Sequence, residues 1–270
     1  MRYTINHWYG RLGNNIQQIS NAIYYCRLNG FNFHSPPHSL IEEFSENFGV
    51  ESDLSSTFYS YSEGGEDVDY DVNDLNSQRK SICETFILPR LKIPLLKKPL
   101  PSSTLVVHLR GGDIFNRNPA YQSIPGGYVQ NPLCFYEGLF KKFKSILVVA
   151  EDLSNPLIEP LQKKQKVKII CSSIEEDFSL LLRAKNLAPS GVGTFAIAAA
   201  LCSKNIENLF CTNLFWDSHL NPLMLKSKIN VEINKLSGYI QMGEWKNTQA
   251  QKALMLKYKC QYSQLEDNQT

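Results

Sequence analysis

Short apolar runs alternate with helix-like repeats along most of the chain, and the alternation is clearest after residue 103. β-Branched and apolar runs predict strands over five segments, 104–110, 145–150, 167–171, 186–189 and 208–212. Apolar side chains at helical spacing predict helices in the four intervals, 133–143, 156–165, 174–182 and 195–202. Elements that alternate in this way are typical of a doubly wound α/β domain with a parallel sheet.

The start of the chain shows the same organisation. Strands are predicted over Tyr3–Tyr9 and Phe31–His34. Apolar residues recur at helical spacing between them from Ile16 onward, and Asn29-Gly30 is a stop signal, so the segment predicts a strand–helix–strand unit. The interval 45–77 is acidic and carries two adjacent glycines, which predicts a loop-rich segment.

Prolines predict a linker between two domains. Pro94, Pro99 and Pro101 surround two lysines, and the boundary is placed at residue 100. The predicted domains are therefore 1–100 and 101–245, followed by a C-terminal extension over 246–270. Two α/β halves joined by such a hinge predict a ligand cleft between them.

The composition is that of an ordinary globular protein, with 270 residues, 43% hydrophobic residues, 20% charged residues and a net charge of +2. No apolar run approaches the ~20 residues of a membrane span, and the polar opening Met1–His7 is unlike a signal peptide. The seven cysteines form no C-x-x-C pair, which predicts buried thiols in a reducing compartment rather than a disulfide framework or a zinc site. We therefore expect a soluble, cytoplasmic chain, and no motif indicates a nucleic-acid partner.

Charge is unevenly distributed along the chain. Eleven acidic residues and no Lys or Arg lie between Glu42 and Asp74, whereas basic residues gather at 141–144, at 163–168 and from Lys226 to Lys259. Solvated faces explain most of each cluster. The sequence leaves open an anionic partner for the basic half, either a nucleotide or a membrane surface.

The segment Thr104–Asp113 carries the clearest candidate chemistry. His108 and Arg110 are two apart, so they emerge on one face of a strand near its carboxyl end, where open α/β sheets bind ligands. A guanidinium there offers a fixed fork of donors suited to phosphate. The alternative is a buried strand that ends in a solvated arginine, followed by an ordinary Gly-Gly-Asp turn.

Two glycine-containing loops, 10–15 and 190–195, follow predicted strands and open helices. Each places small residues beside the N–H groups of a helix N-terminus, which suits a phosphate. A plain turn explains the first loop equally well, and a simple cap at Thr194 explains the second. The first loop is not G-x-G-x-x-G, and the chain lacks that motif with a downstream ribose-binding acid, which disfavours a dinucleotide-dependent oxidoreductase. Glu151-Asp152 ends another strand, and Asp177 lies in a first helical turn, where the helix dipole favours a carboxylate in any case.

Four of these motifs together resemble those of fucosyltransferases. His108-Leu-Arg-Gly-Gly-Asp113 resembles the H-x-R-R-G-D motif of α-1,2-fucosyltransferases and the H-x-R motif of protein O-fucosyltransferases. Gly10-Arg-Leu-Gly-Asn-Asn15 is similar to their G-G-L-G-N-Q or G-R-F-G-N-Q, and Ala150-Glu-Asp152 to their S-D-D. Asp177-Phe178 and the segment Ser190–Phe195 resemble their D-F…S-x-S-T-F block. The four motifs occur in the family's order and cover most of residues 3–203.

The resemblance implies an inverting GT-B glycosyltransferase with two Rossmann-like domains facing a central cleft and no obligatory metal or cofactor. Residues 1–100 would form the acceptor side and 101–245 the nucleotide-sugar side. A helix over Trp245–Tyr262 would pack back across the domains, or lie on a membrane surface as a Lys-rich amphipathic helix. The implied donor-binding residues are Gly13, Asn14, His108, Arg110, Asp177, Ser190, Gly193, Thr194 and Phe195.

The resemblance also implies roles. Arg110 would hold the β-phosphate and neutralise charge as GDP leaves, while His108 and Asp177 would contact the nucleoside. Ser190, Thr194 and Phe195 would form the phosphate and sugar cradle. Asp113 is the nearest candidate for the acceptor base, although turn stabilisation explains this residue equally well, and no acceptor-binding residue is assigned.

The chain departs from the family pattern at two places. Gly111 stands where the motif has its second arginine, and Gly193-Thr-Phe-Ala-Ile197 lacks the tryptophans of S-T-F-S-W-W. The implied reaction is transfer of L-fucose from GDP-fucose to a hydroxyl of an oligosaccharide or other glycan. Two alternatives stay open, a transferase of the same fold with a different nucleotide sugar and a non-catalytic nucleotide- or glycan-binding module.

Overall fold

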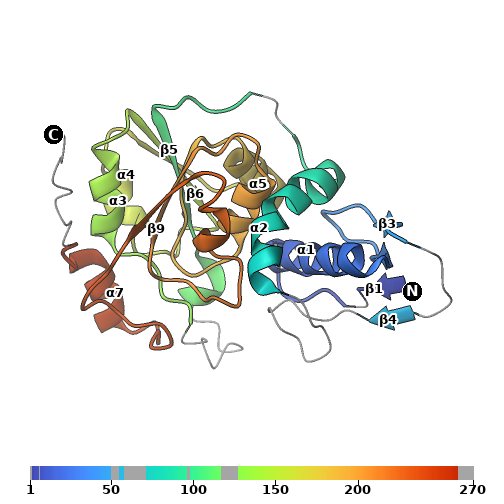
Figure 1. The fold of residues 1–270 in the computed structure, drawn as a ribbon. Coiled ribbons are helices and arrows are strands. Elements are labelled where there is room, and N and C mark those ends of the chain that lie inside the picture. The colour runs from blue at the N-terminus through green and yellow to red at the C-terminus, as the bar shows by residue number, and fades with distance from the viewer. Residues whose placement is uncertain are drawn as a thin grey trace, which may run out of the picture.

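A computed structural model describes residues 2–5, 7–49, 55–57, 71–95, 98–116 and 127–260. Two sheets lie side by side, with the helices α1 and α2 between them (Figure 1). The larger sheet has six parallel strands, β5 (Thr104–Leu109), β6 (Ser145–Ala150), β7 (Val167–Ile170), β8 (Asn186–Ala188), β9 (Asn208–Thr212) and β10 (Asn230–Asn234). Their order is β10-β9-β8-β5-β6-β7, which confirms the predicted α/β fold with a parallel sheet. β10 was not predicted.

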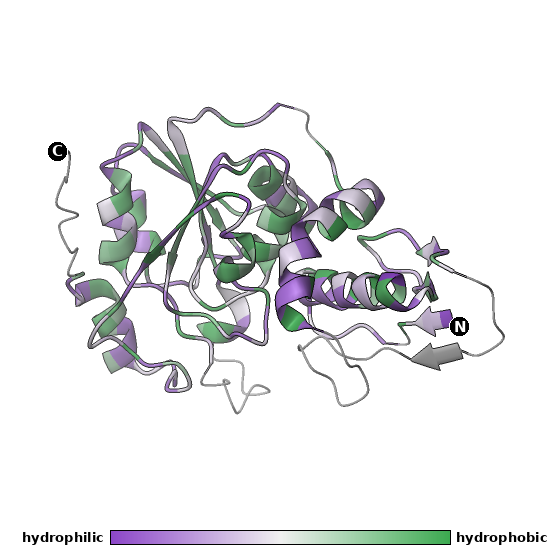
Figure 2. Ribbon diagram, viewed as in Figure 1, coloured by the Kyte–Doolittle hydropathy of each residue, from purple (hydrophilic) through white to green (hydrophobic). Residues whose placement is uncertain are grey.

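Helices cover both faces of the six-stranded sheet. They are α3 (Leu133–Phe140), α4 (Ile158–Gln162), α5 (Ile174–Leu182), α6 (Phe195–Cys202) and α7 (Gln249–Lys257). Every residue of β5 is buried, and its side chains alternate between two apolar clusters. Val106 faces the side of α5 and α6, whereas Leu105 and Val107 face α3 and α4. Figure 2 shows hydrophobic residues along the strands of this sheet and on the helices against it.

The N-terminal sheet is smaller, with the order β3-β2-β1-β4. Its strands are β1 (Arg2–Thr4), β2 (Asn32–His34), β3 (Ser45–Glu46) and β4 (Ser55–Thr57), and β2 and β3 pair antiparallel. β1 is shorter than predicted. α1 (Leu12–Asn29) begins earlier than predicted and ends at Gly30, whose φ of 66° is the left-handed conformation typical of a helix stop.

A second helix of this half was missed by the sequence analysis. α2 (Val72–Ile82) starts inside the segment predicted to be a loop, with the Asp71 carboxylate accepting from the Asn73 N–H. It continues through a π-helical segment, Cys83–Ile87, and a 3₁₀ segment, Leu88–Arg90. The helix carries many polar residues and no clear apolar stripe. Much of its stability therefore comes from contacts with α1 and α6.

The two halves share one core. A single apolar cluster contains Ile16, Ile19 and Ile23 of α1 together with the apolar residues of α6. The six-stranded sheet has the Rossmann-like form that was expected, whereas the N-terminal sheet does not clearly show a second Rossmann-like domain. The boundary at residue 100 and the GT-B arrangement therefore stay predictions.

The C-terminal segment differs from expectation in two ways. α7 packs against α3, and its Met255 lies in the cluster on the far face of the large sheet, so the expected packing across both domains is wrong. Cys134 and Cys260 form a disulfide that ties the end of this segment to α3, which corrects the prediction of unpaired thiols. Four of the remaining cysteines are buried as predicted, Cys26, Cys83, Cys202 and Cys211, and Cys171 is exposed.

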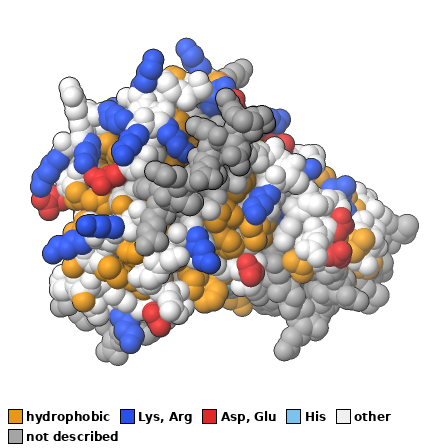
Figure 3. Space-filling view, turned by 60° about the vertical axis from the view of Figure 1, so that its left-hand side comes forward, with side chains coloured by type: hydrophobic (Ala, Val, Ile, Leu, Met, Phe, Trp, Pro, Cys, Tyr) orange, Lys and Arg blue, Asp and Glu red, His pale blue; other side chains and the backbone are white. Residues whose placement is uncertain are grey.

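Lysines and arginines are spread over the surface around α3, α4 and α7, with hydrophobic groups between them (Figure 3). Several lysines pair with carboxylates: Lys142 with Glu232, Lys163 with Glu159 and Lys164 with Glu137. This pairing agrees with a solvated face. No helix among the described residues is long and apolar enough to cross a membrane.

We expect Gly13→Ala to destabilise the protein by about 1–3 kcal/mol, because an added Cβ would lie 2.7 Å from the Thr194 carbonyl carbon and 2.8 Å from the Phe195 nitrogen. Glycine-to-alanine changes inside helices ordinarily stabilise them. Gly193→Ala is the matched control, since its Cβ would meet nothing closer than 3.7 Å. Urea unfolding of the two variants measures the difference, and a stabilised Gly13→Ala protein would contradict the close contact.

Candidate functional site

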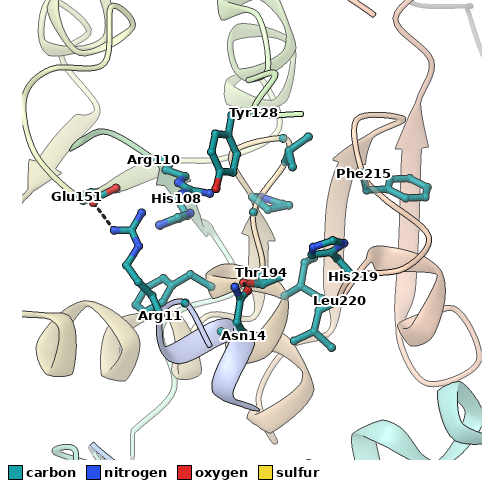
Figure 4. A pocket seen from close by; sticks show the side chains of 18 of the residues that line it. Arg11, Asn14, His108, Arg110, Tyr128, Glu151, Thr194, Phe215, His219 and Leu220 are labelled. Atoms are coloured by element: carbon teal, nitrogen blue, oxygen red, sulfur yellow. Dashed lines mark hydrogen bonds and ion pairs between the residues drawn. The ribbon is translucent and has the colours of Figure 1, made fainter. Parts of the chain in front are cut away.

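A cavity of about 570 Å³ opens at the carboxyl ends of the large sheet, where it meets the first turn of α1 (Figure 4). It lies at the junction of the two halves, as predicted for a ligand cleft. Nine of the predicted site residues line it: Gly13, Asn14, His108, Arg110, Asp113, Asp177, Gly193, Thr194 and Phe195. Ser190 does not line it and is buried.

His108 and Arg110 emerge on the α6 side of β5, which confirms that they share a face. The centres of the His108 and Phe195 rings are 5.3 Å apart, and the centres of the Phe195 and Phe178 rings are 5.2 Å apart. Burial lowers the pKa of His108 to about 4, so its imidazole is neutral at neutral pH. The histidine is therefore suited to hydrogen bonding rather than to ion pairing.

Asp177 lies in the first turn of α5 and faces the same cavity. It is buried, and burial raises the pKa of this carboxyl to about 6. Its Oδ1 atom and the Nδ1 atom of His108 are both buried without a hydrogen-bond partner in the protein. Buried polar atoms normally have partners, and both residues line the cavity, so they are candidates for contact with a polar ligand.

The Arg110 guanidinium is fixed by two contacts. Its Nη2 atom lies 3.1 Å from Asp113 Oδ2, and its Cζ atom lies 4.3 Å from the centre of the Tyr128 ring. The Arg110 carbonyl accepts from Asn155 Nδ2 at 2.8 Å, which secures the strand end itself. Arg110 Nε is buried without a protein partner. The guanidinium thus keeps donor capacity for a ligand while its plane is held on the aromatic ring.

The Gly111-Gly112 turn is held by the two carboxylates that end β6. Gly111 N–H donates to Glu151 Oε2 at 3.1 Å, and Gly112 N–H donates to Asp152 Oδ2 at 2.9 Å. A side chain at position 111 would overlap the Asp152 carboxylate. Position 111 therefore has no room for a side chain in this arrangement of the turn. Glu151 lines the cavity, whereas Asp152 serves the turn.

Arg11 crosses from the N-terminal half to this turn. It pairs with Glu151, and its Nη2 atom lies 3.2 Å from Asp113 Oδ1. Asp113 is therefore held between two guanidinium groups, which is the environment of a structural ion-pair partner. The proposed role of Asp113 as acceptor base stays a prediction.

Asn14 and Thr194 join the first turns of α1 and α6. The Thr194 hydroxyl donates to Asn14 Oδ1 at 2.7 Å. Because this hydroxyl is engaged with Asn14, the backbone amides of the 193–195 turn are the more direct candidates for holding an anion. Neighbouring Gly193 would place a Cβ only 3.9 Å from Arg110 Cδ, so the turn and the guanidinium lie side by side.

Several cavity residues were missed by the sequence analysis: Arg11, Tyr128, Leu214, Phe215, Trp216, His219 and Leu220. Most of them belong to the segment after β9, which has no motif and no periodicity. Figure 4 shows Phe215, His219 and Leu220 across the cavity from Arg11 and Glu151. The sequence offered one signal for these residues, because Arg11 stands between Gly10 and Gly13 of a candidate ligand-binding loop. Among the described residues, no group of His, Cys, Asp or Glu is arranged to hold a metal ion.

Asp177→Asn is expected to raise the free energy of unfolding by roughly 2 kcal/mol at pH 7.5, because the wild-type carboxylate is then ionised in a buried site. A raised pKa in the folded state means that the wild-type protein loses stability as pH rises from 3.8, the ordinary value, through about 6. The advantage of the variant should therefore vanish below about pH 4. Urea unfolding from pH 3.5 to 7.5 measures the stability difference between the variant and the wild type, with the exposed Asp217→Asn as control. A difference that does not vary with pH would contradict the raised pKa of Asp177.

No family model matches the chain, and no curated protein matches it. Among solved structures, the chain is similar to a crystal structure of POFUT1, a protein O-fucosyltransferase, in complex with GDP. The match has a TM-score of 0.39 and 10% identity, and it covers 80% of this chain and 98% of that chain. The similarity is distant and concerns the fold alone.

Proposed function

We propose that this protein is an inverting, metal-independent glycosyltransferase that transfers L-fucose from GDP-fucose to a glycan hydroxyl. One observation carries the proposal: Arg110 and the amide-rich turn before α6 lie side by side in one wall of the cavity. A guanidinium and a helix N-terminus are both suited to the oxygens of a diphosphate. The motif resemblance at His108–Asp113 and Ser190–Phe195 supports the same assignment.

The nucleoside would occupy the end of the cavity between β5 and α5. Asp177 Oδ1 and His108 Nδ1 lie there without protein partners. A carboxylate can accept from both the N1–H and the amino group of guanine, whereas uracil offers only one N–H at its pairing edge. These buried groups therefore favour a guanine nucleotide over a uridine nucleotide.

In the transfer itself, the acceptor oxygen forms a bond to the anomeric carbon while the bond from that carbon to the β-phosphate oxygen breaks. Negative charge then grows on the departing GDP. Arg110 and the amides of the 193–195 turn would stabilise this charge, which is the contribution that preorganised donors make in many enzymes. The acceptor proton would pass to a general base, for which Asp113 is the nearest candidate, and the proposed transfer uses no metal ion.

The second candidate is a non-catalytic nucleotide-binding module. It is favoured by the pairing of both cavity arginines with carboxylates, Arg110 with Asp113 and Arg11 with Asp113 and Glu151. A nucleotide phosphate would have to compete with these carboxylates. Such a module binds GDP but releases no nucleoside diphosphate from a nucleotide sugar.

We expect GDP to bind more tightly than UDP or dTDP in calorimetric titrations, and GDP-fucose to release GDP most rapidly in a panel of nucleotide sugars. Release should be unchanged by EDTA. Preference for another nucleotide would refute the donor assignment, whereas GDP binding without turnover of any donor in the presence of a glycan panel would favour the binding module.

Arg110→Ala should lower the transfer rate by roughly 10²–10³-fold, because it removes the donor that stabilises the departing diphosphate. Arg110→Lys should recover only part of the rate, since an ammonium lacks the planar fork. Arg27→Ala is the matched control, because this exposed arginine lies in the last turn of α1, roughly 20 Å along the helix from its first turn. A rate for Arg110→Ala equal to that of the control would exclude this arginine from the chemistry.

A further inference from the structure

The segment between β9 and the 3₁₀ helix Pro222–Leu225 forms the wall of the cavity that the proposed donor site does not use. Two contacts connect this wall to Arg110. Arg110 lies on the Tyr128 ring, and the preceding residue in the chain, Gly127, lies against the indole of Trp216. Trp216 is therefore connected to Arg110 through the adjacent residues Gly127 and Tyr128.

Trp216 is exposed, although neighbouring residues leave a defined space for its side chain. Trp216 is 39% exposed and lines the cavity. A Cβ added at Gly127 would lie 2.7 Å from Trp216 Nε1, so the absence of a side chain at Gly127 leaves room for the indole edge. A large aromatic side chain left open to solvent at a cavity wall forgoes burial energy that a core position would provide.

The loop that presents Trp216 is held in place by two buried amide side chains. Asn221 Nδ2 donates to the carbonyls of Asp217 and His219 at 3.3 and 3.1 Å. From α1, Gln17 Nε2 donates to the Ser218 carbonyl at 3.1 Å, and Gln17 Oε1 accepts from the Leu220 N–H at 3.0 Å. Both amides are almost fully buried. The loop is thus preorganised, and a rigid aromatic group binds a ligand with little loss of entropy.

We infer that this loop is the acceptor subsite, with Trp216 as the platform on which a sugar ring of the acceptor glycan stacks. The inference rests on the proposed function. The C–H groups on one face of a pyranose ring are apolar and slightly positive, and they complement the negative face of an indole. A sugar placed there would have its hydroxyls directed along a wall that leads to the diphosphate groups around Arg110.

His219 is a polar residue in the same wall. Its Nδ1 atom lies 3.1 Å from Ser218 Oγ, and burial lowers the pKa of His219, which favours the neutral ring. A neutral imidazole hydrogen-bonds a hydroxyl without introducing charge. An aromatic platform beside one or two polar groups is the usual composition of a small-ligand subsite.

A binding experiment tests the subsite without requiring turnover. The protein contains three tryptophans: Trp8, Trp216 and Trp245. Trp245 is buried, so Trp216 should dominate the response to a ligand in the cavity. The methyl glycosides of galactose, glucose, mannose and N-acetylglucosamine are titrated into the protein, with and without GDP, while tryptophan fluorescence is recorded. At least one glycoside should change the emission of the wild-type protein and of Trp8→Phe, and none should change that of Trp216→Ala.

A kinetic split completes the test. With an acceptor chosen by that titration, Trp216→Ala should raise the KM for the acceptor roughly ten- to thirtyfold and Trp216→Phe should raise it less. The affinity for GDP measured by calorimetry should stay unchanged in both variants. Trp216 is exposed, so these variants are expected to fold, and thermal unfolding verifies this.

The outcomes separate the two proposals. If GDP itself changes Trp216 emission and Trp216→Ala weakens GDP binding, the tryptophan belongs to the nucleotide site and the inference is wrong. If no glycoside changes the emission while GDP binds and GDP-fucose is turned over, the acceptor lies elsewhere and only the inference fails. If GDP does not bind the wild-type protein, the proposed function fails, and with it the meaning of this wall as an acceptor subsite.

Discussion

The contact between the first turns of α1 and α6 is the constraint on which the candidate site depends. Gly13 lets the two helix ends approach to van der Waals distance, and the Thr194–Asn14 hydrogen bond joins them. Both N-termini carry partial positive charge, so their approach is unfavourable unless negative charge lies nearby. Three carboxylates face the same cavity, those of Asp113, Glu151 and Asp177. The two helix N-termini and the two arginines are positive groups around the cavity. They make it suitable for a further anion in addition to these three carboxylates.

Buried polar side chains reinforce the apolar core around that contact, both within the N-terminal half and between the two halves. Arg79 of α2 is fully buried and donates to Ser20 and Asn21 of α1. Lys80 donates to the carbonyls of Ala200 and Ser203, at the C-terminal end of α6. A cation at that end of a helix is favoured by the dipole. Such networks stabilise one relative placement of the helices, since displacement would leave buried groups without partners.

The charged wall and the aromatic wall of the cavity are built differently. On the charged wall, Arg110 and Arg11 are each held by carboxylates, and the Gly111-Gly112 turn is fixed by hydrogen bonds from its amides. On the aromatic wall, the loop that carries Trp216 and His219 is held by hydrogen bonds from the amide side chains of Gln17 and Asn221 to backbone carbonyls of the loop. One wall thus offers directional charge and the other an apolar surface. A nucleotide sugar likewise carries a charged diphosphate, whereas an acceptor sugar presents the apolar face of its ring.

Local sequence patterns determined the parallel sheet, because strands buried on both faces, such as β5, must be continuous apolar runs bounded by turn residues. They also placed His108 and Arg110 on one face, since side-chain alternation along a strand is a local property. Tertiary structure alone decided the rest. α2 was missed because its polar surface is satisfied by α1 and α6, and the disulfide was missed because Cys134 and Cys260 are 126 residues apart. Arg11 and Trp216 were missed as cavity residues for the same reason. Each contacts residues that are far away in the chain, Glu151 and Gly127, and no local sequence pattern indicates such contacts.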